Sequence, residues 1–302
     1  MEKITDNPLV SFCLFTYNQE KYILDALNGA INQNYDNMEI IVSDDCSSDN
    51  TFQIIQDFFE NYKGKHQIKL NKNKTNLGIR NHFNKLIYDI AKGDIIIVAA
   101  GDDVSLPERT KVTVDFFKLN PQVKSLHFKS IQVDENLKIL PNKNILISEG
   151  LNSIITLDDY LNSNIWLYSG DSRAFTREII NKFPKLEICR NEDMPTFIRA
   201  IILGATAYIR QGLVLRRIDG NNTSLQWRFK QEGKDLQKQL FNDIEYALKQ
   251  GYIDNICYES LKKKILNVIV EMKFYDLERL LPPIMFLYRI FIAFPRFIAK
   301  KI

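Results

Sequence analysis

Short apolar runs alternate with amphipathic segments over the first hundred residues of the chain. Apolar residues that recur at helical spacing predict three amphipathic helices, at 21–33, 51–62 and 80–91. The apolar runs between them are too short for helices and predict buried strands, at 10–15, 39–43, 67–70 and 94–99. This alternation is typical of an α/β fold, a mostly parallel sheet that helices cover on both faces.

The pattern is less regular after this region. It predicts further helices at 108–118, 157–161 and 194–203. It also predicts one or two antiparallel strands within 125–133 and a pair of strands within 205–217.

The composition changes near the C-terminal quarter, where the chain becomes helical and rich in lysine. We therefore expect two regions, an α/β domain over 1–228 and a helical C-terminal region over 229–302.

Composition excludes several classes of protein. Of the 302 residues, 45% are hydrophobic and 25% charged, the mixture of a globular protein with a substantial core. The net charge of +3 gives no electrostatic argument for nucleic-acid binding. The four cysteines are widely spaced without a CxxC pair, which favours a reducing compartment over a disulfide framework. We expect neither a signal peptide nor a transmembrane helix, because no apolar run is long enough.

Adjacent aspartates follow two of the predicted strands. Asp44 and Asp45 follow the second strand, and Asp102 and Asp103 follow the fourth. The carboxyl ends of parallel strands meet at one edge of a sheet, and paired carboxylates there suit a hard divalent cation. Either pair alone also fits a helix N-terminus, where carboxylates accept from free N–H groups. Helix capping does not require two such pairs, so their duplication favours a ligand site.

Four segments resemble, in the correct order, the blocks of family 2 glycosyltransferases. They are VSFCLFTYNQEKYI at 10–23, QNYDNMEIIVSDDCSSDNT at 33–51, Asn76-Leu77-Gly78 with Asn84, and the run from Ala91 to Asp103. The resemblance covers roughly residues 8–225. It implies a GT-A fold, with a nucleotide-binding half at about 1–105 and an acceptor-binding half at about 106–228. It also implies transfer of a sugar from a nucleotide-sugar, expected to be UDP-linked, to a hydroxyl of a glycan or lipid-linked acceptor.

The resemblance implies which residues contact the nucleotide. They lie at the ends of the first two strands, at Thr16, Tyr17, Asn18, Asp44 and Asp45. Asp45 matches the family aspartate that hydrogen-bonds the uracil ring. Arg80 has two interpretations, a phosphate contact or a solvated helix residue.

The same resemblance implies a bound Mn²⁺ or Mg²⁺. Asp102 and Asp103 match the metal-binding DxD region, and we expect Asp103 to contact the cation and Asp102 the ribose or the cation. Many relatives have a further acidic residue two positions earlier, where this chain has Ala100. Asp219 stands where related enzymes have a histidine near the metal, and it is a third candidate ligand.

Glu192 and Asp193 resemble the family ED motif, whose aspartate acts as the catalytic base. A carboxylate within hydrogen-bond reach can take the proton of the acceptor hydroxyl as that hydroxyl attacks. We favour Asp193 over Glu192, although both also fit a helix start with Pro195 in its first turn. The acceptor region of the family falls on residues that also suit a core, namely Trp166, Tyr168, Ser169, Gly170 and Arg173.

The segment 280–302 is rich in Phe and Ile and contains no acidic residue. Arg289, Arg296 and Lys300 share one helical face, which suits a helix in a membrane interface, although Pro295 would kink it. The alternative is a terminal helix docked on the domain or on another subunit. We favour the membrane surface, and so a cytoplasmic enzyme peripheral to the inner face of the membrane. The family resemblance adds the context of O-antigen or capsule synthesis.

Three other functions fit the sequence less well. A nucleotidyltransferase would need a Gly-rich basic loop after the first strand, where 16–20 reads TYNQE. A dinucleotide oxidoreductase would need GxGxxG at that place. A non-catalytic binding module would explain Ala100 and Asp219, but the retained carboxylate pairs argue against it. The QxxRW motif of processive synthases is absent, so we expect one sugar per cycle, with inversion implied by the resemblance.

Overall fold

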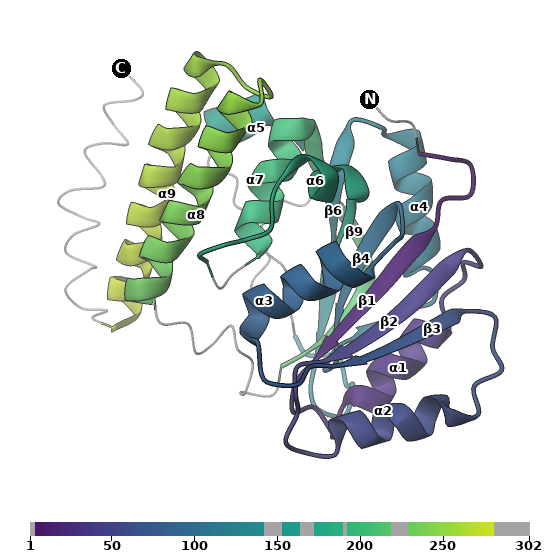
Figure 1. Cartoon of the computed structure of the whole chain (residues 1–302). Helices are drawn as coiled ribbons and strands as arrows, with labels where there is room; N and C mark the ends of the chain where they lie inside the picture. The colour runs from purple at the N-terminus through teal and green to yellow at the C-terminus, as the bar shows by residue number, and fades with distance from the viewer. Residues whose placement is uncertain (1–3, 142–152, 164–171, 190–191, 219–228, 281–302) are drawn as a thin grey trace.

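The structure, a computed structural model, describes residues 4–141, 153–163, 172–189, 192–218 and 229–280 (Figure 1). Within these residues, nine strands form one mixed sheet: β1 (Val10–Thr16), β2 (Met38–Asp44), β3 (Gln67–Lys72), β4 (Ile95–Ala100), β5 (Val104–Ser105), β6 (Val123–Val133), β7 (Ser153–Thr156), β8 (Arg173–Thr176) and β9 (Ala205–Arg217). Their order is β3-β2-β1-β4-β8-β6-β9-β5, with β7 paired to β9. The first four strands of this order are parallel, so their carboxyl ends meet at one edge.

Helices cover both faces of the sheet (Figure 1). They are α1 (Ile23–Ile31), α2 (Thr51–Glu60), α3 (Gly78–Asn84), a π-helix η1 (Lys85–Ile90), α4 (Arg109–Leu119), α5 (Leu157–Asn162), α6 (Arg177–Lys182), α7 (Asp193–Leu203), α8 (Phe229–Lys249) and α9 (Asn255–Leu280). The expected α/β class is confirmed.

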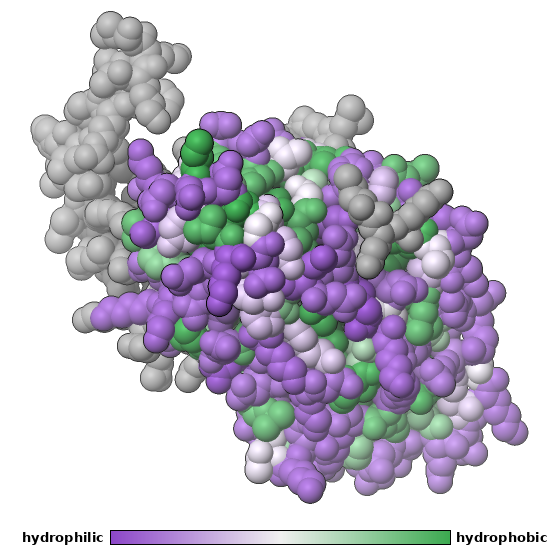
Figure 2. Space-filling model, turned by 45° about the horizontal axis from the view of Figure 1, so that its top comes forward, coloured by the Kyte–Doolittle hydropathy of each residue, from purple (hydrophilic) through white to green (hydrophobic). Residues whose placement is uncertain are grey.

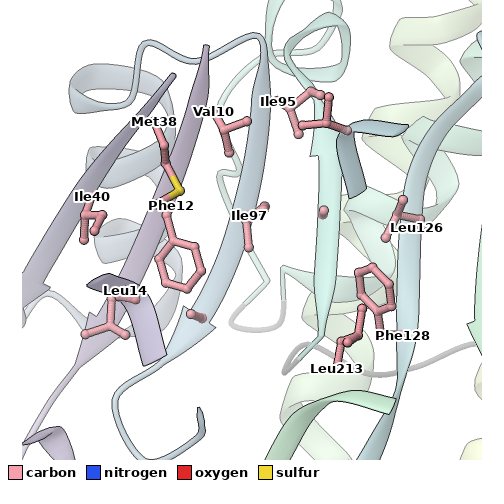
Figure 3. Packing of buried hydrophobic residues seen from close by; sticks show 14 of the residues in the cluster. Val10, Phe12, Leu14, Met38, Ile40, Ile95, Ile97, Leu126, Phe128 and Leu213 are labelled. Atoms are coloured by element: carbon pink, nitrogen blue, oxygen red, sulfur yellow. The ribbon is translucent and has the colours of Figure 1, made fainter. Parts of the chain in front are cut away.

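The apolar strands bury both of their faces because successive side chains point to opposite sides of a sheet. Val10, Phe12 and Leu14 of β1 pack in the core beneath α1, α2 and α4 (Figure 3). Cys13 points to the other side and joins the core beneath α3 and η1. Because helices cover both faces of the sheet, successive residues of these strands are mostly apolar.

The prediction of two strands within 205–217 was wrong, and the helix predicted at 80–91 differs in type over its second half. Residues 205–217 form the single strand β9, because Gly212 lies at a shift in the register with β6 rather than in a hairpin turn. The helix predicted at 80–91 is α3 followed by the π-helix η1. The single strand β6 runs antiparallel to β8 but parallel to β9. β5, β7 and β8 have only two to four residues, too few to show a period.

A second apolar core joins the C-terminal helices to the rest of the protein. Leu236, Leu240 and Ile244 of α8 pack with Phe197 and Ile201 of α7. The space-filling view shows hydrophilic residues over most of one face, with apolar residues in small groups between them (Figure 2). None of the helices within the described residues is long and apolar enough to cross a membrane. The predicted membrane-surface segment lies almost wholly in 281–302, outside the described residues.

Candidate active site

A cavity of about 390 Å³ opens at the carboxyl ends of β1, β2 and β4. Its polar wall comes from Thr16, Tyr17, Gln19, Asp45, Asn76, His82, Asp102 and Glu192. Ligands of open α/β sheets bind outside the carboxyl ends of the strands, so the cavity lies where this topology places a ligand.

Asp45 is held rigidly at the end of β2. Its Oδ1 accepts from Asn73 Nδ2 at 2.8 Å and from the Leu77 N–H at 2.9 Å, and its Oδ2 accepts from the Gly78 N–H at 2.9 Å. Gly78 has a positive φ of 72°, which glycine adopts without strain. The turn before α3 therefore fixes the carboxylate against the cavity.

Two buried polar atoms beside the cavity have no hydrogen-bond partner within the described structure, Thr16 Oγ1 and Gln19 Oε1. Buried polar groups are normally paired, so these atoms suit a polar ligand. Both approach Gly101, where an added Cβ would lie 2.8 Å from Thr16 Oγ1 and 2.3 Å from Gln19 Oε1. Glycine at position 101 therefore allows the end of β4 to lie close to the end of β1.

The adjacent aspartates after β4 differ in their surroundings. Asp102 lines the cavity. The Asp103 side chain turns toward the end of β9, where its Oδ1 accepts from the Arg217 N–H at 2.9 Å. Arg217 in turn donates to the Asp102 carbonyl at 2.6 Å, which ties the turn to the sheet.

Two carboxylates at the start of α7 form ion pairs with one buried guanidinium, that of Arg173. Arg173 of β8 is fully buried, and its guanidinium lies 3.1 Å from Glu192 Oε1 and 2.7 Å from Asp193 Oδ1. Glu192 also lines the cavity. Burial first, and repulsion from Asp193 second, raise the pKa of Glu192 to about 7, against the opposing effect of Arg173. The pair therefore retains a proton near neutral pH.

Comparison with known proteins identifies the family. The profile of glycosyl transferase family 2 matches residues 11–182, more than half of the chain. The chain belongs to glycosyl transferase family 2. It is 25% identical over 282 residues to an uncharacterized glycosyltransferase of Haemophilus influenzae, covering 90% of this chain and 82% of that one. The enzyme is thus a glycosyltransferase.

Solved structures support the GT-A-like fold of this glycosyltransferase. Staphylococcus aureus TarS 1–349 in complex with UDP-GlcNAc matches with a TM-score of 0.65 and 21% identity, over 86% of this chain and 72% of that one. The mannosyltransferase PcManGT from Pyrobaculum calidifontis, in complex with GDP-Man and Mn²⁺, matches with a TM-score of 0.58 and 15% identity, over 98% and 84%.

The structure brings Thr16, Tyr17, Asp45, Asp102 and Glu192 together around one cavity. Other predicted residues of the glycosyltransferase make structural contacts. The buried Asp44 accepts from the Ser47 N–H and hydroxyl, and Asn18 Oδ1 accepts from the Ser48 N–H. Arg80 Nη1 donates to the carbonyls of Glu187 and Ile188, which holds the loop before Glu192. Asp219 and the acceptor candidates within 164–171 lie outside the described residues.

Sequence reasoning did not select Gln19, Ile79, His82 and Phe83, which also line the cavity. Helical spacing offers a signal for three of them, since positions three and four apart share a face of α3. For Gln19 the sequence holds no such signal, because its place depends on the approach of β1 to Gly101.

We expect Glu192 to make the stability of the glycosyltransferase depend on pH. Its pKa rises from an ordinary 4.5 to about 7 on folding, so the folded state binds the proton more tightly. Relative to Glu192→Gln, the free energy of unfolding should be highest below about pH 4.5, fall as the pH rises to about 7, and then level off. Urea unfolding of both proteins across this range measures the difference. A difference independent of pH would contradict the assignment.

Proposed function

We propose that this glycosyltransferase uses a UDP-sugar donor, bound in the cavity at the strand ends. The observation that carries the proposal is Asp45, a rigid carboxylate in the cavity wall at the position that the family uses for uracil. The unpartnered Thr16 Oγ1 and Gln19 Oε1 offer further polar contacts. The relative TarS was solved with UDP-GlcNAc, which supports the same nucleotide here.

A divalent cation, Mn²⁺ or Mg²⁺, fits the residues near Asp102. Within the described residues no three acidic, histidine or cysteine side chains converge on a metal position, so the protein offers few ligands. Mn²⁺ and Mg²⁺ can bind with few protein ligands, because they take the remaining ligands from phosphate oxygens and water. Asp102, in the cavity wall, would hold the cation, and Asp103, whose Oδ1 accepts from the Arg217 N–H, and Asp219 are further candidates. The cation would offset charge on the departing diphosphate. PcManGT, solved with GDP-Man and Mn²⁺, supports the same chemistry.

Asp193 is the proposed base. Burial and the neighbouring Asp193 raise the pKa of Glu192, which disfavours Glu192 as a base at neutral pH. The ion pair with Arg173 holds the Asp193 carboxylate in place, and 22% of the Asp193 side chain remains exposed to an incoming hydroxyl. Attack on the side of the sugar opposite the diphosphate inverts the anomeric centre. We propose a glycan or lipid-linked acceptor in surface-polysaccharide assembly, with one sugar added per cycle.

Calorimetric titration with UDP, GDP and TDP, each with and without Mn²⁺, tests the donor site. UDP should bind best, and Mn²⁺ should tighten its binding by at least about tenfold, a change of 1.4 kcal/mol. Asp102→Ala should remove most of the Mn²⁺ effect, since Asp102 lines the cavity. Asp134→Ala, outside the cavity, is the control and should bind as the wild type does. Failure of every nucleotide to bind would overturn the proposed function.

A further inference from the structure

The imidazole of His82 in α3 lines the cavity, and one of its ring nitrogens is hydrogen-bonded to a buried serine. The residue is 4% exposed, lines the cavity and lies edge-on to Phe15, with ring centroids 5.0 Å apart. His82 Nε2 lies 2.7 Å from Ser43 Oγ. A neutral imidazole has one N–H donor and one acceptor nitrogen, so the direction of this bond decides what Nδ1 offers a ligand.

A chain of hydrogen bonds fixes that direction from its far end. Lys85 Nζ can only donate, and it lies 2.6 Å from Asn73 Oδ1. An ionised Asp45 can only accept, and its Oδ1 lies 2.8 Å from Asn73 Nδ2. These two partners set the orientation of the Asn73 amide. Asn71 Nδ2 then donates to Asn73 Oδ1 at 3.1 Å and, with its second N–H, to Ser43 Oγ at 2.8 Å.

The last step follows from the single proton of the Ser43 hydroxyl. Ser43 is fully buried, and its oxygen already accepts from Asn71. Within the described residues, the remaining partner of the hydroxyl is His82 Nε2. A hydroxyl proton left without an acceptor would carry a full desolvation cost, so Ser43 donates to Nε2. The neutral ring therefore carries its proton on Nδ1. Burial lowers the pKa of His82, which favours this neutral form at pH 7.

We propose that His82 is a specificity residue of the donor site, whose Nδ1–H donates to a ring carbonyl of the nucleobase. This inference rests on the proposed function. Among the described residues, Asp45 Oδ2 accepts one bond, from the Gly78 N–H, and a carboxylate oxygen can accept two. An acceptor on Asp45 near a donor on His82 matches the adjoining N–H and C=O of uracil. Cytosine offers an acceptor and an amino group there, so the site disfavours it.

The tautomer is tested directly by ¹⁵N NMR of histidine-labelled protein without ligand. The chain has three histidines, and His82→Gln assigns the signal of interest. We expect His82 to be protonated at Nδ1 in the wild type. Ser43→Ala removes the donor to Nε2 and should shift the proton toward Nε2 without removing the ring. Protonation at Nε2 in the wild type would overturn the inference.

Base selectivity is tested by calorimetry with UDP and CDP in the presence of Mn²⁺. The wild type should prefer UDP, and His82→Gln and Ser43→Ala should each reduce the ratio of Kd values by about tenfold, the effect of one hydrogen bond in a buried site. His66→Gln replaces a buried histidine outside the cavity wall and should leave the ratio unchanged.

The outcomes separate this inference from the proposed function. If the wild type binds neither nucleotide, both fail. If the wild type binds UDP and the UDP-to-CDP ratio persists in folded His82→Gln and Ser43→Ala, only the role of His82 fails. Circular dichroism of each variant establishes that it is folded, and Ser43→Ala, which removes one oxygen atom, serves if His82→Gln does not fold.

Discussion

Asp193→Asn should lower kcat by about 10²–10⁴-fold, the usual contribution of a general base. The amide keeps the shape of the side chain but cannot take the proton of the acceptor hydroxyl. The Kd for UDP should change little, because Asp193 is not among the residues that line the cavity at the strand ends. Steady-state kinetics with the UDP-sugar and acceptor found by screening, together with calorimetry on the same preparations, separates the two effects.

Glu192→Gln is the matched control for this experiment. Both variants exchange a carboxylate for an amide on the same guanidinium, that of Arg173. Glu192→Gln should lower kcat much less than Asp193→Asn if Asp193 is the base. The reverse order, with Asp193→Asn close to wild-type activity, would transfer the role to Glu192. Equal large losses with weakened UDP binding in both would indicate instead that the variants disturb the structure around Arg173.

The position of the site was predictable from the sequence because local patterns determine it. β1, β2 and β4 are largely apolar segments of six or seven residues, and polar residues lie at or just after the carboxyl end of each. The structural role of Asp44, which accepts from the Ser47 N–H, could also be predicted. Ser47 lies only three residues later, and such local hydrogen bonds compete with ligand binding.

Contacts between distant segments account for what the sequence did not show. Arg173 and Glu192 meet because β8, only four residues long, inserts between β4 and β6. The difference between Asp102 and Asp103 arises from the backbone of Arg217, 114 residues after Asp103. No period or motif encodes such pairings. They require the order of the strands, which a single sequence does not contain.

Asp243→Ala should lower the free energy of unfolding by about 3–5 kcal/mol, because it leaves the buried Arg199 guanidinium without its counter-charge. Arg199 of α7 and Asp243 of α8 are 2% and 1% exposed, and two charge-assisted bonds of 2.8 and 2.6 Å join them. Urea unfolding of both proteins measures the loss. Asp115→Ala is the control, because its pair with Lys111 is about half exposed and should contribute no more than about 0.5 kcal/mol.

The same ion pair connects the C-terminal helices to the proposed catalytic pair, Glu192 and Asp193. Gln239 of α8 donates to Asp243 at 3.0 Å and accepts from the N–H groups of Glu187 and Ile188, which lie just before Glu192 in the chain. The double variant Arg199→Met/Asp243→Leu should recover much of the lost free energy of unfolding, since an apolar pair needs no counter-charge. Activity should not return to the same degree, because Gln239 would lose a partner that orients it. Full recovery of both would show that α8 stabilises the fold without positioning Glu192 and Asp193.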